Sequence, residues 1–255
     1  MAIKAIILDW AGTSVDYGCF APVEAFHSAF QAVGMNPTID EIRAPMGMGK
    51  KAHIAAMLHE KPHTEKDIDE IYSLFESCLF EGLAAHTDPL PGVVDTVATL
   101  REMGIKIGST TGYTRAMMDV VAPGALEKGY APDCLVCPEE AGGLGRPFPH
   151  MLWRNLETLQ IASISQVVKV GDTEADIREG VNAGCVSVGV LEGSSMLGLN
   201  QVEFASLAFD EALDLLSIAQ DNYKNAGADF VIRDFAALPA LISSINKEQK
   251  DRNHA

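Results

Sequence analysis

The sequence lacks any apolar run long enough to cross a bilayer. Its first residues also lack the basic start, the apolar segment and the small-residue cleavage site of a secretory signal peptide, and a strand-like run begins almost at once. These absences argue against a membrane-bound or exported protein. We therefore expect a cytoplasmic protein without a membrane partner.

Basic residues are scarce as well. The 255 residues include 19 Lys and Arg against 35 Asp and Glu, which gives a formal net charge of −16. Nucleic acids and anionic membrane surfaces repel such a chain, so neither is an expected partner. An anionic substrate would need local help from a metal ion, a few cations or helix N-termini.

Cysteine is sparse, and the spacing of the cysteines does not indicate disulfide pairs. The odd number of five and their scatter at positions 19, 78, 134, 137 and 185 indicate reduced thiols, not a disulfide framework. Cys134 and Cys137 have C-x-x-C spacing, but they lie in an apolar run without a second pair. We therefore interpret them as part of a buried strand and not as a zinc site.

What the sequence does contain is an alternation of strand-like and helix-like segments. Continuous apolar runs indicate strands that are covered on both faces, and amphipathic segments of helix length separate most of them. The alternation predicts an α/β fold with a doubly wound, mostly parallel sheet. The predicted strands are 3–8, 105–110, 134–137, 167–170, 186–190 and 230–232, and the helices between them include 93–103, 115–122, 150–159 and 175–183.

One stretch, residues 20–89, breaks the alternation because it has helical patterns but no strand pattern. It starts just after the turn of the first strand and ends at a breaker cluster, Asp-Pro-Leu-Pro-Gly, at 88–92. We therefore predict a helical cap domain, 20–89, inserted into a core domain made of 1–19 and 90–255. The helical patterns in the cap cover 22–33, 39–44, 51–59 and 65–83.

The most informative segment is the first strand with the turn after it, Ile6-Ile7-Leu8-Asp9-Trp10-Ala11-Gly12-Thr13. An apolar run that ends in Asp9 places a carboxylate at the carboxyl end of a strand, where open α/β sheets build their sites. Asp9 can act as a nucleophile or as a metal ligand. A second aspartate two positions later would complete an acid–base pair, but that position holds Ala11.

Three further polar segments follow predicted strands or precede predicted helices. They contribute Thr111, Arg146, Asp172 and Asp176. Asp9 and Asp172 suit Mg²⁺, and the main-chain carbonyl of Ala11 can add a third oxygen ligand. Thr111 can donate to a phosphoryl oxygen, Arg146 is a permanent cation, and Asp176 can orient Arg146 or bind metal through water. Each signal alone is typical of a turn or a helix cap, but the ordered set favours phosphoryl chemistry.

This ordered set resembles the haloacid dehalogenase superfamily, and the resemblance spans the core from Asp9 to Asp176. It implies that Asp9 forms an aspartyl-phosphate, that Asp172 is the acidic metal motif, and that Thr111 and Arg146 are the hydroxyl and cationic motifs. The insertion resembles the helical cap of that superfamily. Its phosphatases carry a second aspartate where this chain has Ala11. Three explanations stay open: an inactive protein, a dehalogenase, or an enzyme whose leaving group needs no such acid.

A lysine in the predicted cap can replace the missing acid. Lys50 and Lys51 follow a proline- and glycine-containing turn that runs into a helix, where the helix dipole disfavours the charge of a lysine and shielding from water would lower its pKa further. A neutral lysine forms an imine with an aldehyde or ketone. The electrons of a broken P–C bond can flow into that imine if phosphorus is attached to the carbon beside the carbonyl. Two solvated lysines, Lys50 and Lys51, are the simpler interpretation.

With these features the whole chain resembles the phosphonoacetaldehyde hydrolase family. The resemblance is carried by D-W-A-G-T from Asp9, D-Y-G-C-F-A-P from Asp16, P-M-G from Pro45 with Lys50 and His53, and S-T-T-G-Y-T-R from Ser109. It implies hydrolysis of a small phosphonate, 2-phosphonoacetaldehyde, to acetaldehyde and phosphate, in phosphonate degradation. It also implies Mg²⁺ held by two aspartates and one carbonyl, an imine at Lys50, and a homodimer through the cap.

The supporting residues have weaker assignments. His53, one helical turn from Lys50, can relay protons to its nitrogen or can be a structural histidine. Cys19, Met46, Gly112 and Tyr113 are placed in the substrate pocket, although packing between cap and core explains Cys19 and Met46 equally well.

Two alternatives remain. One is another phosphatase or dehalogenase of the superfamily that uses Asp9 without an imine. The other is an inactive protein that binds phosphate or metal, against which the intact set of Asp9, Thr111, Arg146 and Asp172 argues.

Overall fold

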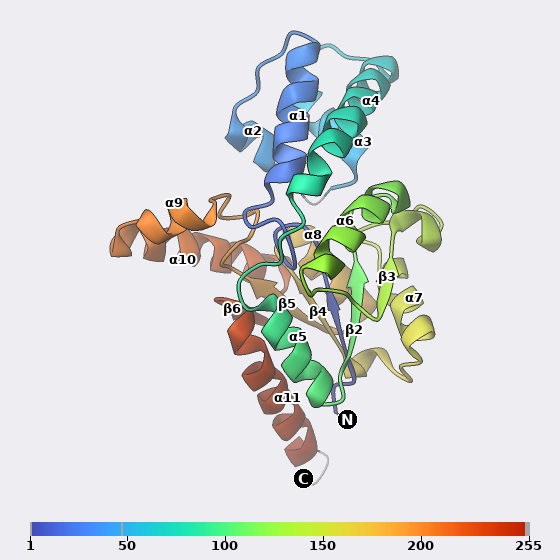
Figure 1. The fold of residues 1–255 in the computed structure, drawn as a ribbon, viewed down its shortest axis with the longest axis vertical. Coiled ribbons are helices and arrows are strands. Elements are labelled where there is room, and N and C mark those ends of the chain that lie inside the picture. Colours follow the sequence, from blue (N-terminus) through green and yellow to red (C-terminus); the bar gives the residue numbers. More distant parts are fainter. Residues whose placement is uncertain (1, 47, 253–255) are drawn as a thin grey trace.

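The computed structural model describes residues 2–46 and 48–252. Its centre is a six-stranded sheet with the order β3-β2-β1-β4-β5-β6, in which every neighbouring pair is parallel (Figure 1). The predicted α/β fold is confirmed, and each predicted strand end lies within two residues of the observed one. The strands are β1 (Ala5–Leu8), β2 (Lys106–Thr110), β3 (Cys134–Val136), β4 (Val167–Gly171), β5 (Val186–Val190) and β6 (Phe230–Ile232).

Helices cover both faces of the sheet because its strands alternate apolar side chains between two cores. Ile6 and Leu8 of β1 pack into the larger cluster, together with α5, α6 and α11. Ala5 and Ile7 pack on the opposite face, against α7 and α8. These helices are α5 (Val93–Glu102), α6 (Arg115–Glu127), α7 (His150–Leu159), α8 (Glu174–Ala183) and α11 (Leu238–Arg252).

Four helices form a separate group above the carboxyl ends of the strands, and we call them the cap helices (Figure 1). Within this group α1 packs against α2 and α4, and α3 packs against α4. Phe26 of α1 and Phe75 of α4 stack at its centre, with ring centroids 4.1 Å apart. Two chain segments, 9–19 and 83–92, connect the group to the sheet. The cap helices are α1 (Phe20–Ala32), α2 (Ile39–Arg43), α3 (Lys50–Leu58) and α4 (Glu65–Gly82).

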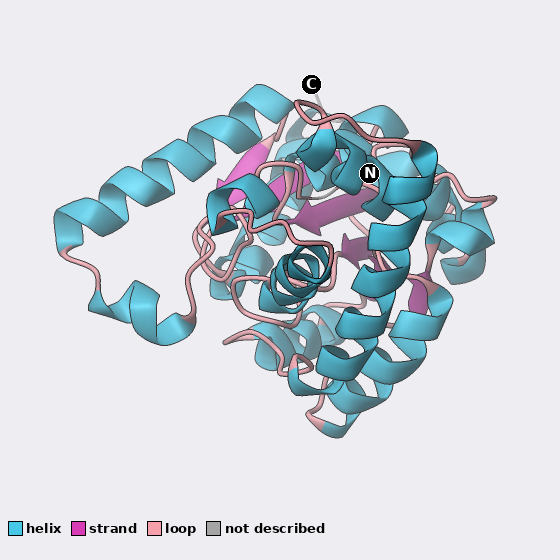
Figure 2. Ribbon diagram, turned by 90° about the horizontal axis from the view of Figure 1, so that it is seen from above, coloured by secondary structure: helices cyan, strands magenta, loops and turns pink. Residues whose placement is uncertain are grey.

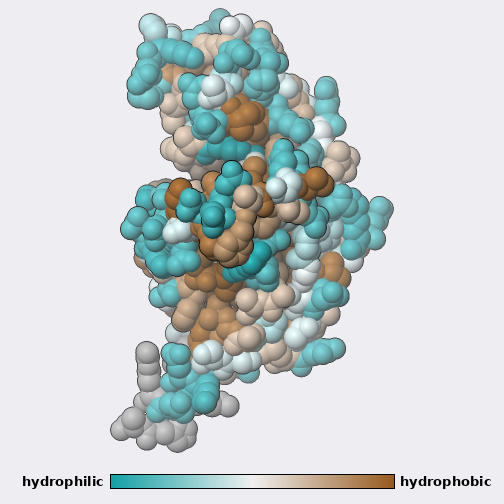
Figure 3. All heavy atoms as spheres, turned by 90° about the vertical axis from the view of Figure 1, so that its left-hand side faces the viewer, coloured by the Kyte–Doolittle hydropathy of each residue, from teal (hydrophilic) through white to brown (hydrophobic). Residues whose placement is uncertain are grey.

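Two more helices, α9 (Gln201–Ser206) and α10 (Phe209–Ala226), project from the side of the molecule (Figure 2). Apolar side chains are visible on this side (Figure 3). Val202 of α9 and Phe209 of α10 are 79% and 77% exposed. All five cysteines are free thiols, as predicted. Within residues 2–46 and 48–252 no helix combines the length and the apolar character that crossing a membrane requires.

Candidate active site

The register of the sheet brings the predicted carboxylates together. Leu8 of β1 pairs with Ser109 of β2 on one side and with Val170 of β4 on the other. The residues that follow these three, including Asp9 and Asp172, therefore emerge at one edge of the sheet. The strand order also reverses at β1, so this edge is the crevice in which open α/β sheets bind ligands.

Three of these carboxylates form a group that can hold a metal ion. Carboxyl oxygens of Asp9, Asp172 and Asp176 all lie within 4.8 Å of one another, and the three residues are buried. Burial, and then the charges of Asp9 and Asp176, raise the pKa of Asp172 to about 8. Negative charge at this position is therefore poorly compensated, and a bound divalent cation would relieve it.

Asp172 is held firmly from both sides. The Thr13 hydroxyl donates to Oδ1 at 2.9 Å, and the Ser195 amide donates to Oδ2 at 2.8 Å. Gly12 lies directly against this carboxylate, because a Cβ there would be 2.3 Å from Oδ2, and its φ of +83° also favours glycine. The glycine after Ala11 thus has a structural reason that the sequence motif alone did not supply.

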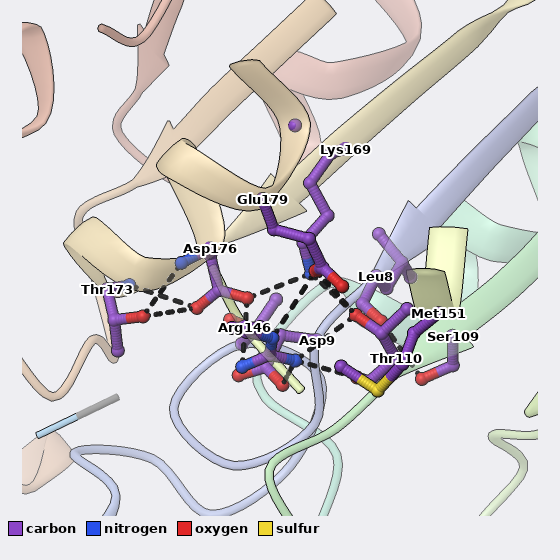
Figure 4. A network of polar contacts seen from close by, with 12 residues as sticks. Leu8, Asp9, Ser109, Thr110, Arg146, Met151, Lys169, Thr173, Asp176 and Glu179 are labelled. Carbon is purple, nitrogen blue, oxygen red and sulfur yellow. Dashed lines mark hydrogen bonds and ion pairs between the residues drawn. The ribbon is translucent and has the colours of Figure 1, made fainter. Parts of the chain in front are cut away.

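Two of these carboxylates, Asp9 and Asp176, belong to a network of buried ion pairs (Figure 4). Arg146 pairs with Asp9, with Asp176 at 3.0 Å and with Glu179 at 3.4 Å. Lys169 of β4 pairs with Asp176 at 2.8 Å, and its ammonium donates to the Thr110 hydroxyl at 3.0 Å. The pKa of Asp176 is lowered, with Arg146 and Lys169 as the favourable charges that outweigh its burial.

The charges of this network and of Asp172 do not balance without a further cation. Four buried carboxylates face two buried cations, so the carboxylates are in excess by two. The cations are Arg146 and Lys169, and the carboxylates are Asp9, Asp172, Asp176 and Glu179. One divalent metal ion would balance the set, and oxygen ligands are those that Mg²⁺ prefers.

The cap helices complete the site from above. A small cavity of about 40 Å³ separates them from the strand ends. Predicted residues from both parts line it: Asp9, Ala11, Cys19, Met46, Lys50, Thr111, Gly112, Tyr113 and Arg146. Gly47, the last residue of the P-M-G motif, lies outside the described residues.

The structure separates the two adjacent lysines. Lys50 is the first residue of α3 and lines the cavity with Asp9. Lys51 points to the outer surface, where its ammonium lies 2.6 Å from Asp69 and the two side chains are 57% and 60% exposed. Only Lys50 is placed to meet a ligand held by Asp9.

Aromatic rings surround the Lys50 ammonium. The centroids of Phe26, Phe75 and Tyr113 lie 5.6, 5.8 and 5.9 Å from Nζ. Because Phe26 and Phe75 are stacked on each other, one ammonium at similar distances from both lies beside the stack and not over both ring faces. The rings therefore desolvate the charge more than they stabilise it. Burial, opposed by Asp9 and aided by Arg146, lowers the pKa of Lys50.

The remaining predicted residues have clear places. His53 does not line the cavity; it is buried and stacks on Phe26 with centroids 4.0 Å apart. Burial and the nearby charge of Lys50 lower the pKa of His53 to about 3, so its ring is neutral. Cys19 precedes α1 with a φ of 54° and is buried. The Thr111 hydroxyl accepts a hydrogen bond from the Tyr113 amide at 3.0 Å.

Sequence reasoning missed Lys169, Glu179 and Thr13. Lys169 had a usable signal, because it is a lone charge inside an otherwise apolar strand run that leads directly to Asp172. A charged residue in a strand covered on both faces needs a buried partner. Glu179 and Thr13 carry no comparable signal, since both residue types are common in helices and turns.

Comparison with known proteins identifies the family to which this chain is similar. The family of haloacid dehalogenase-like hydrolases matches residues 3–184. A phosphonoacetaldehyde hydrolase from Lysinibacillus sphaericus is 46% identical, and the match covers 99% of this chain and 100% of the relative. A bifunctional phosphonoacetaldehyde hydrolase/aminoethylphosphonate transaminase from Clostridioides difficile is 47% identical over 96% of this chain and 40% of its own length.

The fold is also similar to solved structures. A phosphonoacetaldehyde hydrolase-like protein from Oleispira antarctica superposes with a TM-score of 0.92 at 34% identity, covering 97% of this chain and 94% of the other.

Proposed function

The chain belongs to the phosphonoacetaldehyde hydrolases within the haloacid dehalogenase-like hydrolases, and we propose that it hydrolyses 2-phosphonoacetaldehyde through an imine at Lys50 and phosphoryl transfer to Asp9. The products are acetaldehyde and phosphate. The observation that carries the mechanism is one cavity lined by both Lys50 and Asp9, with Ala11 where an acid would otherwise stand.

Lys50 acts first in this scheme. Its neutral amine adds to the aldehyde carbon, and water leaves as the imine forms. The lowered pKa of Lys50 favours the neutral amine that this step needs. Asp9 then attacks phosphorus with a carboxylate oxygen. The P–C bond breaks, its electron pair forms the C=C bond of an enamine, and the C=N electrons move to the Lys50 nitrogen.

Two hydrolytic steps restore the protein. Water cleaves the aspartyl-phosphate and releases phosphate from Asp9. The enamine takes a proton at carbon, and water hydrolyses the resulting imine to acetaldehyde and free Lys50. The position of His53, one helical turn from Lys50 on α3, supports a role as proton relay.

In this scheme the residues of the core compensate the negative charge of the phosphoryl group. Arg146 and Thr111 line the cavity beside Asp9, which supports their role in holding phosphoryl oxygens, and Asp176 and Glu179 pair with the Arg146 guanidinium. Asp9, Asp172 and the Ala11 carbonyl would hold Mg²⁺, with Asp176 behind them. When bound, the ion neutralises phosphoryl charge and so makes phosphorus more open to attack.

The cap helices supply the amine, which supports a cap domain at 20–89 over a core of 1–19 and 90–255. Cys19, Cys137 and Cys185 are buried free thiols, in keeping with a cytoplasmic protein. We also propose a homodimer through the cap, in which α4 takes part through its outer side, because Ile71 and Phe75 of α4 are buried inside the cap. Phe80 of α4 remains 37% exposed and can contribute to such an interface.

Product analysis tests the function. The wild-type protein with Mg²⁺ should release phosphate and acetaldehyde in equal amounts from 2-phosphonoacetaldehyde. Asp9→Asn should release neither. Lys50→Arg keeps the charge but cannot form the imine under these conditions, and it should also be inactive. Phosphate release by Lys50→Arg at the wild-type rate would refute the imine and favour direct phosphatase chemistry at Asp9.

A further inference from the structure

Arg43 is a cap residue whose side chain reaches into the core. It is the last residue of α2, and its Nη1 donates to the Gly18 carbonyl at 2.9 Å and to the Ser195 carbonyl at 3.3 Å. Gly18 lies in the segment that leads from β1 to the cap helices, and Ser195 lies in the loop after β5. One guanidinium thus joins the cap to two separate parts of the core.

The backbone around this contact is built for close approach. A Cβ on Gly198 would lie 2.7 Å from Arg43 Nε, and Gly198 has a φ of +65°. A Cβ on Gly18 would lie 2.6 Å from the Leu199 carbonyl, and its φ is +85°. Both positions therefore favour glycine for two independent reasons. The Arg43 guanidinium also lies over the Phe20 ring, 5.1 Å from its centroid, where a cation is favourably placed.

The same loop orients a carboxylate of the site. The Ser195 amide donates to Asp172 Oδ2 at 2.8 Å, and the Ser195 hydroxyl donates to the Asp172 carbonyl at 3.5 Å. Ser195 therefore accepts a hydrogen bond from the cap through its carbonyl and donates to Asp172 through its amide. A movement of Arg43 away from the core would free the side of this loop that faces the cap.

We propose that Arg43 is a positioning residue that latches the cap helices onto the core and steadies the Ser195 loop against Asp172. It does not line the cavity, so its effect on the reaction is indirect. Its consequence for catalysis rests on the proposed function, whereas the latch is a property of the chain without substrate. Arginine suits the position because its planar group lies over the Phe20 ring while Nη1 donates to both carbonyls, and a lysine stacks on an aromatic ring less well.

Cysteine alkylation of the substrate-free protein measures the latch. Cys19 is 5% exposed and lines the cavity between cap and core, so opening the cap should expose it. Cys137 and Cys185 are buried in the core, 0% and 7% exposed, and report unfolding of the core instead. The alkylation rate of each thiol with iodoacetamide is followed by mass spectrometry of peptides.

Arg43→Met should raise the alkylation rate of Cys19 roughly tenfold or more, because it removes hydrogen bonds from a charged donor that hold the cap closed. The alkylation rates of Cys137 and Cys185 should change little. Arg43→Lys should give an intermediate rate. Arg101→Met is the matched control, because Arg101 also donates to a carbonyl, that of Ala131, but lies on the core surface. It should leave Cys19 unchanged.

Two results would overturn the proposal. An equal acceleration at all three cysteines would assign Arg43 a general role in stability. An unchanged rate at Cys19 in both Arg43 variants would show that the contact does not hold the cap. Because no substrate is present, either result is separate from the outcome of the product analysis.

Discussion

In the proposed mechanism, Ala11 and Lys50 divide between them a task that phosphatases of the superfamily give to one aspartate. Ala11 lines the cavity next to Asp9 but offers no acidic side chain, and Lys50 approaches the same cavity from the cap. A carbanion leaving group is poorly served by a carboxylic acid, whereas an imine accepts its electron pair within the same molecule. In this mechanism the absence of an acid at Ala11 and the presence of an amine at Lys50 therefore depend on each other.

Restoring the acid should not help. Ala11→Asp would add a carboxylate to a buried set that already has two more carboxylates than cations. We expect P–C cleavage to fall on the order of tenfold, because a like charge opposes both the nucleophile and the anionic substrate. Steady-state rates of acetaldehyde release measure this, with Ala11→Asn as the uncharged control. Faster P–C cleavage by Ala11→Asp would contradict the account.

The two neighbouring lysines should titrate differently. Burial lowers the pKa of Lys50, whereas the hydrogen bond to Asp69 raises the pKa of Lys51. The neutral, reactive amine forms as pH rises, so acylation of Lys50 should reach half of its maximal rate below pH 10.5, the ordinary value, and at a lower pH than Lys51. Peptide mass mapping across a pH series gives both curves from one sample. The reverse order would remove the physical basis for imine formation at Lys50.

At the scale of elements, the connections between cap and core carry an ionic bridge. Asp16 in the first connection accepts hydrogen bonds from the amides of Phe20 and Ala21, at 3.0 Å each, and so caps α1. His86 in the second connection lies 3.0 Å from Asp16 and 3.5 Å from Glu24 of α1. The hydrogen bond to Asp16 raises the pKa of His86 above its ordinary value.

This bridge should make stability depend on pH. Because the pKa of His86 is higher in the folded protein than in the unfolded chain, its contribution is fully present below pH 6.5 and is lost as pH rises through the folded value. His86→Asn should lower the free energy of unfolding by roughly 1 kcal/mol at pH 6, and by less at pH 9. Urea unfolding measures it, with the exposed His59→Asn as control. An equal loss at both pH values would mean that His86 acts uncharged.

Much of this arrangement follows from sequence because apolar runs fix buried strands. Once β1 and β4 are neighbours in a parallel sheet, Asp9 and Asp172 must lie together. Other features depend on packing between distant segments. The contact of Arg43 with Ser195 spans 152 positions and requires the cap to be seated. The start of α3 also differs from the sequence pattern, because the helix begins at Lys50, one residue before the predicted start.

At the scale of the whole molecule, the excess of buried carboxylates links metal binding to stability. Since the pKa of Asp172 is raised, its ionised form destabilises the metal-free protein at high pH. Mg²⁺ at a hundredfold excess over its dissociation constant should add about 2.7 kcal/mol to the free energy of unfolding. Thermal unfolding with and without a chelator measures the shift.

Asp172→Asn gives the control for that prediction. Without metal at pH 9, this variant should unfold at a higher temperature than the wild type, because it removes an uncompensated buried charge. It should also lose the response to Mg²⁺. A wild-type response in Asp172→Asn would place the metal elsewhere.

In the proposed mechanism the core holds the phosphorus of the substrate and the cap holds its carbon, and trapping the link between cap and substrate tests this most directly. The protein is incubated with 2-phosphonoacetaldehyde and borohydride, then mapped by peptide mass spectrometry. We predict a reduced two-carbon adduct, with or without the phosphonate group, on Lys50 in the wild type and none in Lys50→Arg. Release of phosphate without any adduct, or an adduct on Lys51 in place of Lys50, would contradict the account.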